Sequence, residues 1–380
     1  MSNNTKEQLH ETILNSDEYF HSLLVDIKNA KQTIDLETYI FNDDDLGKRI
    51  TRELMHAAEK GVKIRLLLDG IGTSAWCDNI KLMEEAGITV RVFNPLPLKL
   101  WQLTRANCRS SFFVKMLRFF TKINSRNHRK TCIIDSSIVY IGSINIAQTH
   151  LSVQQGGAGW MDVVVKITNI NTKELQFAFD IAWYGFSLSK RIKKMFQPVA
   201  SNSIFRLNYS RRQRRLFYRF LLKRISESRS RVWMTNAYFN PEYVLLRKLT
   251  KAAKRGVEVT ILLSHDSDVF FMPLVAQAFY SRLLKAGVNI YEYLPSILHA
   301  KMFIIDDWYC VGSSNLNHRS LIHDLEVDVN IQTKEAKKIL EKIFLQNIKK
   351  SHKISLANFK KIPLYKRILS QLLLYLRYFF

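Results

Sequence analysis

Two short stretches of the chain place a histidine and a lysine two residues apart at the start of an apolar run. The first pair is His128 and Lys130, and the second pair is His299 and Lys301. Each pair is followed by an aspartate and then by Gly-Ser-x-Asn: Asp135, Gly142, Ser143 and Asn145 in the first copy, and Asp306, Gly312, Ser313 and Asn315 in the second. The repetition of these groups at matched spacing indicates a reaction that needs them on two sides.

Histidine and lysine side chains two residues apart on a strand point to the same face. An imidazole beside an ammonium group, with a hydroxyl and an amide nearby, is suited to a phosphate-type anion. Two such half-pockets facing each other would put an imidazole on either side of one phosphorus atom. One imidazole could attack while the other protonates the leaving oxygen, and the roles would reverse in a second displacement.

We therefore predict a site with one half from each copy. The residues assigned to catalysis are His128, Lys130, Asp135, His299, Lys301 and Asp306, and those assigned to phosphate binding are Ser143, Asn145, Ser313 and Asn315. Each motif aspartate follows its strand by a turn, so it is also expected to orient backbone rather than to touch phosphorus. No cofactor and no metal are predicted, because the nearby ammonium repels a cation and no C-x-x-C or H-E-x-x-H spacing supplies ligands. A serine hydrolase is not favoured, since no G-x-S-x-G precedes either motif.

The elements that must position these motifs are also repeated. "AAEKGVKIRLLLD" (57–69) returns as "AAKRGVEVTILLS" (252–264), and "EEAGITVRVF" (84–93) returns as "LKAGVNIYEY" (284–293). Each stretch is typical of a helix that ends at a glycine and is followed by a strand. The sequence therefore predicts an α/β fold of two tandem, internally repeated lobes. The expected division is a first lobe at 1–186, a basic linker at 187–230, a second lobe at 231–350 and a basic amphipathic tail at 351–380.

The charge of the chain points to its partners. There are 57 Lys and Arg against 33 Asp and Glu, a net charge of +24. An excess of this size favours polyanions, which means nucleic acid or an anionic membrane surface, although a basic surface without such a role stays an alternative. No signal peptide and no apolar window long enough to span a bilayer are visible, so a soluble or peripheral protein is expected. The scattered cysteines favour a reducing compartment.

Two segments combine cations with large apolar residues. The first half carries an insertion at about 94–127, with no acidic residue and with Trp101, Phe112, Phe113, Phe119 and Phe120. The second segment, 363–380, would place Leu364, Ile368, Leu372, Leu376 and Phe379 on one helix face and Lys366, Arg367, Ser370 and Gln371 on another. Contact with a membrane surface fits both segments. The alternatives are packing of the insertion against the second half and docking of the tail on the protein itself.

The doubled H-x-K-x4-D and G-S-x-N motifs resemble the signature of the phospholipase D superfamily, over about residues 20–345. More narrowly, "ETYIF" (37–41), "NHRK" (127–130), "NAYFNP" (236–241) and "VGSSNLNHRS" (311–320) look like bacterial cardiolipin synthases of the short type without N-terminal transmembrane helices. The resemblance implies two α/β/α lobes, packed face to face with the active site between them. The turn after Asp306 is one residue shorter than in the first copy, so we expect it to be tightened.

The resemblance also implies roles for individual residues. It implies a phosphohistidine intermediate formed without metal, with His128 as nucleophile and His299 as general acid. In this family an acidic residue holds a catalytic imidazole by its other nitrogen. The position of Glu326 matches this family pattern, and Asp162 is the candidate for the same histidine-orienting role in the first half.

The catalytic motif alone does not identify the substrate. Cationic stretches interleaved with long apolar runs suit anionic lipid better than nucleic acid. The first hypothesis is a phosphatidyltransferase of the cardiolipin synthase type, which joins two phosphatidylglycerol molecules, releases glycerol and works at the cytoplasmic face of a bacterial membrane. Its partners would be phosphatidylglycerol, cardiolipin and the membrane surface. The alternatives are a phospholipase D, a transferase using phosphatidylethanolamine, and a nucleic-acid-binding phosphodiesterase; a catalytically inactive membrane scaffold is disfavoured because both motifs are intact.

Overall fold

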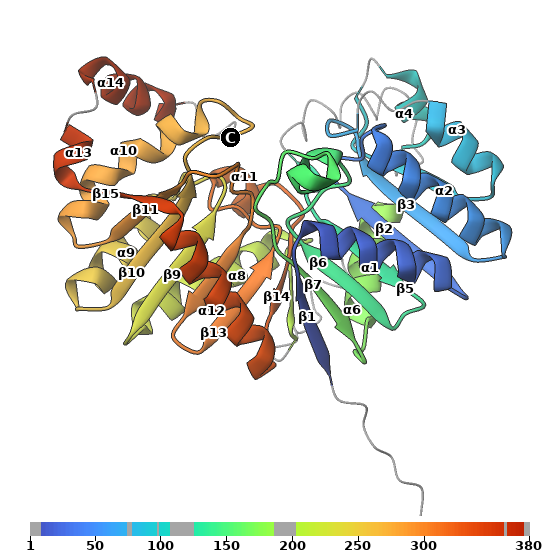
Figure 1. Cartoon of the computed structure of the whole chain (residues 1–380), viewed down its shortest axis with the longest axis horizontal. Coiled ribbons are helices and arrows are strands. Elements are labelled where there is room, and N and C mark those ends of the chain that lie inside the picture. The colour runs from blue at the N-terminus through green and yellow to red at the C-terminus, as the bar shows by residue number, and fades with distance from the viewer. Residues whose placement is uncertain are drawn as a thin grey trace, which may run out of the picture.

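The computed structural model describes residues 9–73, 78–96, 99–106, 125–185, 203–360 and 363–375, and there each half of the chain builds one mixed β-sheet (Figure 1). The first sheet runs in the order β1 (His10–Leu14), β7 (Val164–Thr168), β6 (Ile138–Gly142), β5 (Thr131–Ile134), β2 (Thr33–Thr38), β3 (Lys63–Asp69) and β4 (Thr89–Phe93). The second sheet runs β15 (Ser351–Ile354), β11 (Asn289–Tyr293), β10 (Glu258–Ser264), β9 (Arg231–Asn236), β12 (Met302–Ile305), β13 (Trp308–Gly312), β14 (Val327–Asn330) and β8 (Phe205–Leu207). The predicted α/β fold of two repeated lobes is confirmed.

The parallel part of each sheet comes from the repeated helix–glycine–strand stretches. In the first lobe α2 (Asp45–Glu59) and α3 (Asp78–Glu85) precede β3 and β4, and in the second α9 (Tyr243–Lys254) and α10 (Met272–Lys285) precede β10 and β11. The glycine after each first helix adopts the same left-handed backbone, with φ of 92° at Gly61 and 88° at Gly256. A side chain disfavours this conformation, so glycine ends the helix and turns the chain into the strand.

The apolar run of each repeated motif forms an antiparallel hairpin, β5–β6 in the first lobe and β12–β13 in the second. Ile134 pairs with Ile138 at the end of the first hairpin, whereas Ile305 pairs with Trp308 at the end of the second. The second hairpin therefore turns with one residue fewer, as the spacing after Asp306 predicts. The two hairpins contact each other through β6 and β13 where the lobes meet, and the motif histidines lie in the segments that lead into β5 and β12.

Helices cover the outer faces of the sheets, and a shared core joins the lobes. One cluster packs α1 (Ser16–Asn29) and α2 on the first sheet, and another packs α8 (Arg211–Glu227), α9 and α10 on the second. A third cluster holds residues of both sheets together with α6 (Lys173–Tyr184) and α12 (Lys334–Lys349): Ile133, Ile141, Val165, Leu175, Met302, Ile304, Val311 and Leu340. Burial of one such side chain contributes about 1.5–3 kcal/mol, so the lobes form one packed unit.

The shorter elements lie in the connections. They are α4 (Leu100–Thr104), η1 (Gln148–His150), η2 (Val153–Gln155), α11 (His318–Ile322), α13 (Leu356–Lys360) and α14 (Leu364–Leu373). Among the residues that the structure describes, none of the helices combines the length and apolarity needed to cross a bilayer. Cys132 and Cys310 are buried free thiols on β5 and β13.

The sheets divide the chain differently from the expected lobe boundaries at two places. β8 pairs with β14, and α8 buries Leu221 and Ile225 in the second core, so the described part of the expected linker belongs to the second lobe. β15 pairs with β11, so the start of the expected tail completes the second sheet. These three elements, β8, α8 and β15, were missed because short strands and a highly cationic helix carry weak apolar periodicity. We propose that the first lobe ends between α6 and β8.

The basic insertion is described only at its two ends. Residues 107–124, with four of its five predicted aromatic contacts, lie outside the described part, as do Leu376 and Phe379 of the tail. At the near end, Trp101 of α4 packs partly buried against the core of the first lobe. This one aromatic residue therefore packs on its own lobe and not on the second half.

Candidate active site

Backbone bridges between the lobes bring the two motif copies together. The Asn127 segment pairs with that of Leu325, and the Met161 segment pairs with that of Leu298. The amide of His128 donates to the carbonyl oxygen of Leu325 at 2.9 Å. In the mirror arrangement, the amides of His299 and Ala300 donate to the carbonyl oxygen of Met161 at 2.8 and 2.9 Å. Each histidine is thus anchored to a segment of the other lobe.

The first half-site is a pair between His128 and Glu326. Nδ1 of His128 lies 3.0 Å from Oε2 of Glu326, and both side chains are buried. The hydroxyls of Ser313 and Ser320 donate to the two oxygens of the same carboxylate. Because an ionised carboxylate can only accept, Nδ1 carries the proton and Nε2 is left for substrate.

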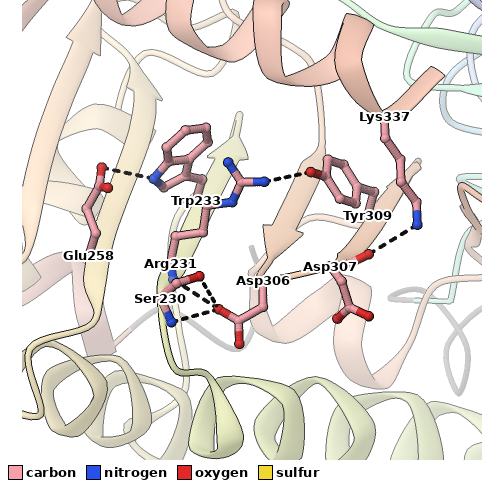
Figure 2. A pocket seen from close by; sticks show the side chains of 8 residues that line it. All are labelled: Ser230, Arg231, Trp233, Glu258, Asp306, Asp307, Tyr309 and Lys337. Carbon is pink, nitrogen blue, oxygen red and sulfur yellow. Dashed lines mark hydrogen bonds between the residues drawn. The ribbon is translucent and has the colours of Figure 1, made fainter. Parts of the chain in front are cut away.

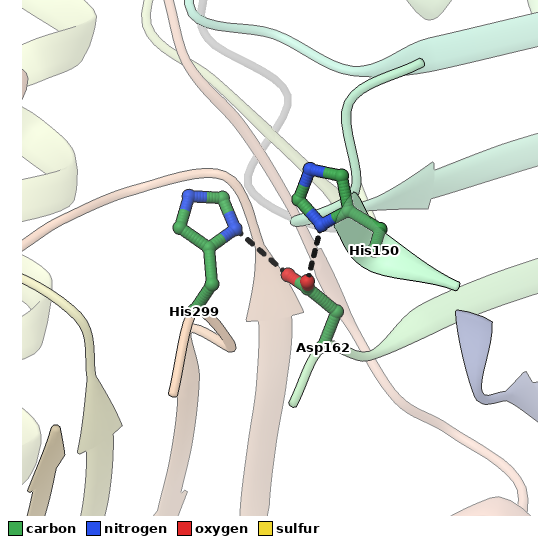
Figure 3. Close-up of side chains that lie close together, drawn as sticks. All are labelled: His150, Asp162 and His299. Carbon is green, nitrogen blue, oxygen red and sulfur yellow. Dashed lines mark hydrogen bonds and ion pairs between the residues drawn. The ribbon is translucent and has the colours of Figure 1, made fainter. Parts of the chain in front are cut away.

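The second half-site contains one histidine more (Figure 3). Nδ1 of His299 lies 2.8 Å from Oδ1 of Asp162, and Nδ1 of His150 lies 2.7 Å from Oδ2 of the same carboxylate. The hydroxyl of Ser143 also donates to Oδ1 of Asp162. The carboxylate therefore lies between two imidazoles, and each ring directs its Nε2 away from it (Figure 3).

The pairing of carboxylates and histidines crosses between the lobes. Asp162 comes from the first half and orients the histidine of the second, whereas Glu326 comes from the second half and orients the histidine of the first. The sequence identifies both carboxylates by resemblance but leaves open which imidazole each one holds. The geometry supports a histidine-orienting role for both residues.

The motif lysines are buried at the start of the hairpins. Nζ of Lys130 donates to the carbonyl oxygen of His128 at 2.7 Å, and Lys301 makes the equivalent bond to His299. Burial lowers the pKa of both ammonium groups, well below the usual value for Lys130 and to about 8 for Lys301. Two ammonium groups held in a buried site are suited to a phosphate anion, whose negative charge would offset the cost of burying them.

The motif serines differ from the predicted phosphate-binding role. Their hydroxyls are engaged by Asp162 and Glu326, so in this structure they fix the carboxylates instead of facing a free pocket. The preceding glycines explain this contact: a Cβ at Gly142 or Gly312 would collide with the backbone of β7 or β14. Only glycine lets the serine approach the next strand so closely.

The motif asparagines are buried beside the hairpins. Oδ1 of Asn145 accepts the amide of Ile40 at 3.2 Å, which leaves its Nδ2 as a donor. The backbone amide of Asn315 donates to Oγ of Ser320 at 3.3 Å. Within the described residues, the side-chain Oδ1 of Asn315 has no hydrogen-bond partner. Phosphate binding by these two amides stays a prediction.

The motif aspartates lie at the far end of the hairpins from the histidines. Asp135 accepts the amides of Lys31, Gln32 and Thr33 at 2.7–2.9 Å. Figure 2 shows the equivalent position of Asp306, which accepts the backbone amides of Ser230 and Arg231 at the start of β9. These bonds hold the pKa of Asp306 at about 2 although burial acts against ionisation. Both side chains serve the backbone, which agrees with the orienting role and not with the catalytic assignment.

The pKa values of the two imidazoles shift in the same direction, whereas those of the two carboxylates that hold them shift in opposite directions. Burial and the neighbouring lysines lower the pKa of His128 and of His299. Burial raises the pKa of Glu326 to about 7. Against the same burial, the charges of His299 and His150 hold the pKa of Asp162 well below its usual value. A bound phosphate would raise the pKa of both imidazoles, since opposite charge favours the protonated form.

Residues that the sequence analysis missed line the same site. His150 bonds to Asp162, and Ser320 bonds to Glu326. Trp160 packs its ring 5.6 Å from that of His299, and the Tyr39 ring lies 5.2 Å from His128. One signal was present: His150 follows Ser143 by the same interval at which Ser320 follows Ser313.

The group of His150, Asp162 and His299 has the residue types of a metal site. Its three ligand atoms lie within 4.8 Å of one another. The contacts of 2.7 and 2.8 Å are hydrogen-bond distances, whereas ligand atoms around tetrahedral zinc stand about 3.3 Å apart. The arrangement therefore fits a hydrogen-bonded chain better than a cation.

Comparison with known proteins agrees with this site. A family model described as "Cardiolipin synthase, PLD-like domain" matches residues 23–167 and 221–348. The cardiolipin synthase of Clostridium perfringens strain SM101 is 30% identical over 364 residues, which cover 92% of this chain and 72% of that protein. Cardiolipin synthase B of Salmonella typhi is 32% identical over 327 residues, which cover 83% of this chain and 75% of that protein.

Solved structures show the same fold. Phosphatidylserine synthase of Haemophilus influenzae aligns with a TM-score of 0.68 over 97% of this chain and 95% of that chain, at 14% identity. Polyphosphate kinase of Porphyromonas gingivalis aligns with a TM-score of 0.58 over 92% of this chain and 49% of that chain, at 15% identity. The two lobes and their paired motifs define an enzyme of the phospholipase D superfamily. Within it, the chain belongs to the cardiolipin synthase family with phospholipase D-like domains.

Proposed function

We propose that this enzyme transfers a phosphatidyl group from one phosphatidylglycerol molecule to another, releasing glycerol and forming cardiolipin. The observation that carries this proposal is the pair of buried imidazoles, each backed by a carboxylate from the opposite lobe. A double displacement at one phosphorus atom needs a nucleophile on one side and an acid on the other. The names of the relatives supply the lipid class.

In the first step Nε2 of His128 attacks phosphorus and the bond from phosphorus to the glycerol oxygen breaks. His299 gives its Nε2 proton to that oxygen, so glycerol leaves neutral and a phosphatidyl group stays on His128. In the second step His299 takes the proton from a hydroxyl of another phosphatidylglycerol, whose oxygen attacks phosphorus and releases His128. Glu326 stabilises the positive charge that develops on His128 in both steps.

The buried cations would hold the phosphate during these steps. Lys130 and Lys301 each lie two residues after a motif histidine, in the segments that lead into β5 and β12. Together with the amides of Asn145 and Asn315 they would balance the charge on the non-bridging oxygens. This assignment leaves the chemistry to side chains of the protein itself.

The C-terminal helix supports a membrane-bound location. α14 packs on α10 through Ser370, which is buried, and through the partly buried Leu373. Its apolar face is left outside: Leu364, Ile368, Leu369 and Leu372 are 66%, 52%, 42% and 55% exposed. The helix thus docks on the protein and still presents apolar side chains to the outside. In its described part, docking of the tail on the protein is therefore compatible with contact with a membrane surface. We propose that this face lies in the headgroup region of the cytoplasmic leaflet of a bacterial membrane.

The test is to incubate the purified protein with phosphatidylglycerol vesicles in the presence of a metal chelator and to identify products by mass spectrometry. Cardiolipin and glycerol are expected, and both should disappear in His128→Ala and in His299→Ala. Phosphatidic acid as the sole product would identify a phospholipase D, because water and not a second phosphatidylglycerol would then accept the phosphatidyl group in the second step. Product only with added phosphatidylethanolamine would identify that donor, and cleavage of DNA with no lipid product would identify a nuclease.

A further inference from the structure

The two half-sites hold their carboxylates with different partners. Glu326 accepts from His128 and from the hydroxyls of Ser313 and Ser320. Asp162 accepts from His299, from the hydroxyl of Ser143 and from a second imidazole. One carboxylate therefore serves one histidine, and the other is shared between two.

The residue that makes this difference occupies an equivalent place in the repeat. Ser143 and Ser313 belong to the two copies of Gly-Ser-x-Asn, and seven residues later the chain has His150 and Ser320. His150 ends η1 and Ser320 lies in α11, and both reach the carboxylate that holds the catalytic histidine of the other lobe. A hydroxyl in one half thus stands where an imidazole stands in the other.

The side chain of His150 is buried and is fixed by ring packing and by one hydrogen bond. It is 1% exposed, and its ring lies 4.9 Å from that of Trp160 and 5.5 Å from that of His299. The charged or titratable groups around it are Asp162 and His299, with Lys301 and Tyr238 beyond the latter; on the outer side Asp44 accepts the amide of Gln148 in the same short helix. Its only polar side-chain contact among the described residues is Asp162.

We propose that His150 is a positioning residue that makes the half-sites unequal, by sharing Asp162 with His299 so that His299 acts as the acid and His128 as the nucleophile. The proposal rests on the proposed function. A carboxylate divided between two imidazoles stabilises the charged form of each less than an undivided one would. His299 therefore releases its proton more readily, whereas Glu326 is shared with no second imidazole and supports the charge of His128, where the bond to phosphorus forms.

The test compares His150→Ser, which copies the other half-site, with His150→Asn, whose amide can keep a donor near the place of Nδ1. kcat is measured against pH for a phosphatidyl substrate with an alcohol leaving group, and also for a p-nitrophenyl phosphodiester. In His150→Ser, kcat for the alcohol should fall about tenfold and its alkaline limb should move up by about one pH unit, because His299 becomes more basic. Release of p-nitrophenolate, which needs no proton, should change less than threefold. His150→Asn should recover most of kcat with KM unchanged.

His56→Ser is the matched control, since this histidine is exposed on α2, and it should behave as the wild type. Equal losses on both substrates, or unaltered pH profiles in His150→Ser, would reduce His150 to a packing residue and overturn the proposal. A wild-type enzyme that cleaves the phosphodiester but makes no cardiolipin would contradict the proposed function alone. A wild-type enzyme inactive on both substrates would contradict both.

Discussion

Oε2 of Glu326, in the second half of the chain, lies 3.0 Å from Nδ1 of His128 in the first half. Asp162 and His299 repeat the relationship in the opposite direction at 2.8 Å. Each of the two motif histidines is thus held by a carboxylate of the opposite lobe. The catalytic unit is therefore the joined pair of lobes, which gives a physical reason for the duplication.

We expect Glu326→Gln to lower kcat by about 100-fold or more with little change in stability. Glutamine keeps an oxygen near Nδ1 of His128 but removes the charge that stabilises the developing cation, and residues that orient a catalytic ligand carry effects of this size. The measurement is the rate of cardiolipin formation beside Glu59→Gln, whose carboxylate is exposed on α2. Wild-type rates in Glu326→Gln would show that the pair is only structural.

Activity should fall as the pH drops through about 7. Burial raises the pKa of Glu326 to about 7, so below that pH the side chain is neutral and no longer supports a charged His128. The sign for stability is opposite: a carboxyl whose pKa is raised by folding favours the folded state at low pH, and that contribution is lost as the pH rises towards 7. The acid limb of kcat/KM measures the first effect. The limb should vanish in Glu326→Gln; if it persists, another group titrates there.

The two histidines should respond differently to the leaving group. A p-nitrophenolate leaves without a proton, so His299→Ala should release a burst of nitrophenolate from a p-nitrophenyl phosphodiester, whereas His128→Ala should release none. Stopped-flow absorbance measures the burst, and mass spectrometry of the quenched protein detects the adduct on His128. A burst in His128→Ala and none in His299→Ala would reverse the assigned roles.

Asp306→Ala should affect folding more than chemistry. The side chain accepts the amides of Arg229, Ser230 and Arg231, and its loss should cost about 1–3 kcal/mol of unfolding free energy. Because the pKa of Asp306 is depressed to about 2, this contribution is present above pH 4 and is lost as the pH falls through 2. Urea denaturation measures the free energy, and Asp307→Ala, next to it and exposed, is the control. A large drop in kcat at unchanged stability would restore the catalytic assignment.

Serine substitutions of Leu364, Ile368 and Leu372 together should weaken binding to phosphatidylglycerol vesicles by more than tenfold. Each of these α14 side chains is more than half exposed, and burying one in the interface is worth about 1.5–3 kcal/mol. Vesicle flotation measures the binding. Ile339 and Leu345 on α12, 41% and 45% exposed, supply a control pair that should bind as the wild type does. Equal binding by all three proteins would place the membrane contact elsewhere.

Most of the fold and half of the site could be predicted from the sequence, because they depend on local patterns. The helix–glycine–strand steps at Gly61 and Gly256 need only apolar periodicity and a residue that tolerates positive φ. The His-x-Lys pairs were visible because the same spacing returns in both halves of the chain, although the structure places both pairs just before β5 and β12 and not on them. The shortened turn after Asp306 was also visible, since a hairpin with one residue fewer must turn more tightly.

Contacts between residues far apart in the chain were decided by the tertiary structure alone. The packing of the two lobes decides which carboxylate holds which imidazole. It also decides that the hydroxyls of Ser143 and Ser313 donate to those carboxylates and that His150 shares Asp162 with His299. β8 and β15 are strands because β14 and β11 offer them an edge, and their own residues carry little signal. Local propensity acts within a few residues, whereas a site between two lobes is set by the packing of their shared core, and the sequence carries no simple periodic trace of that packing.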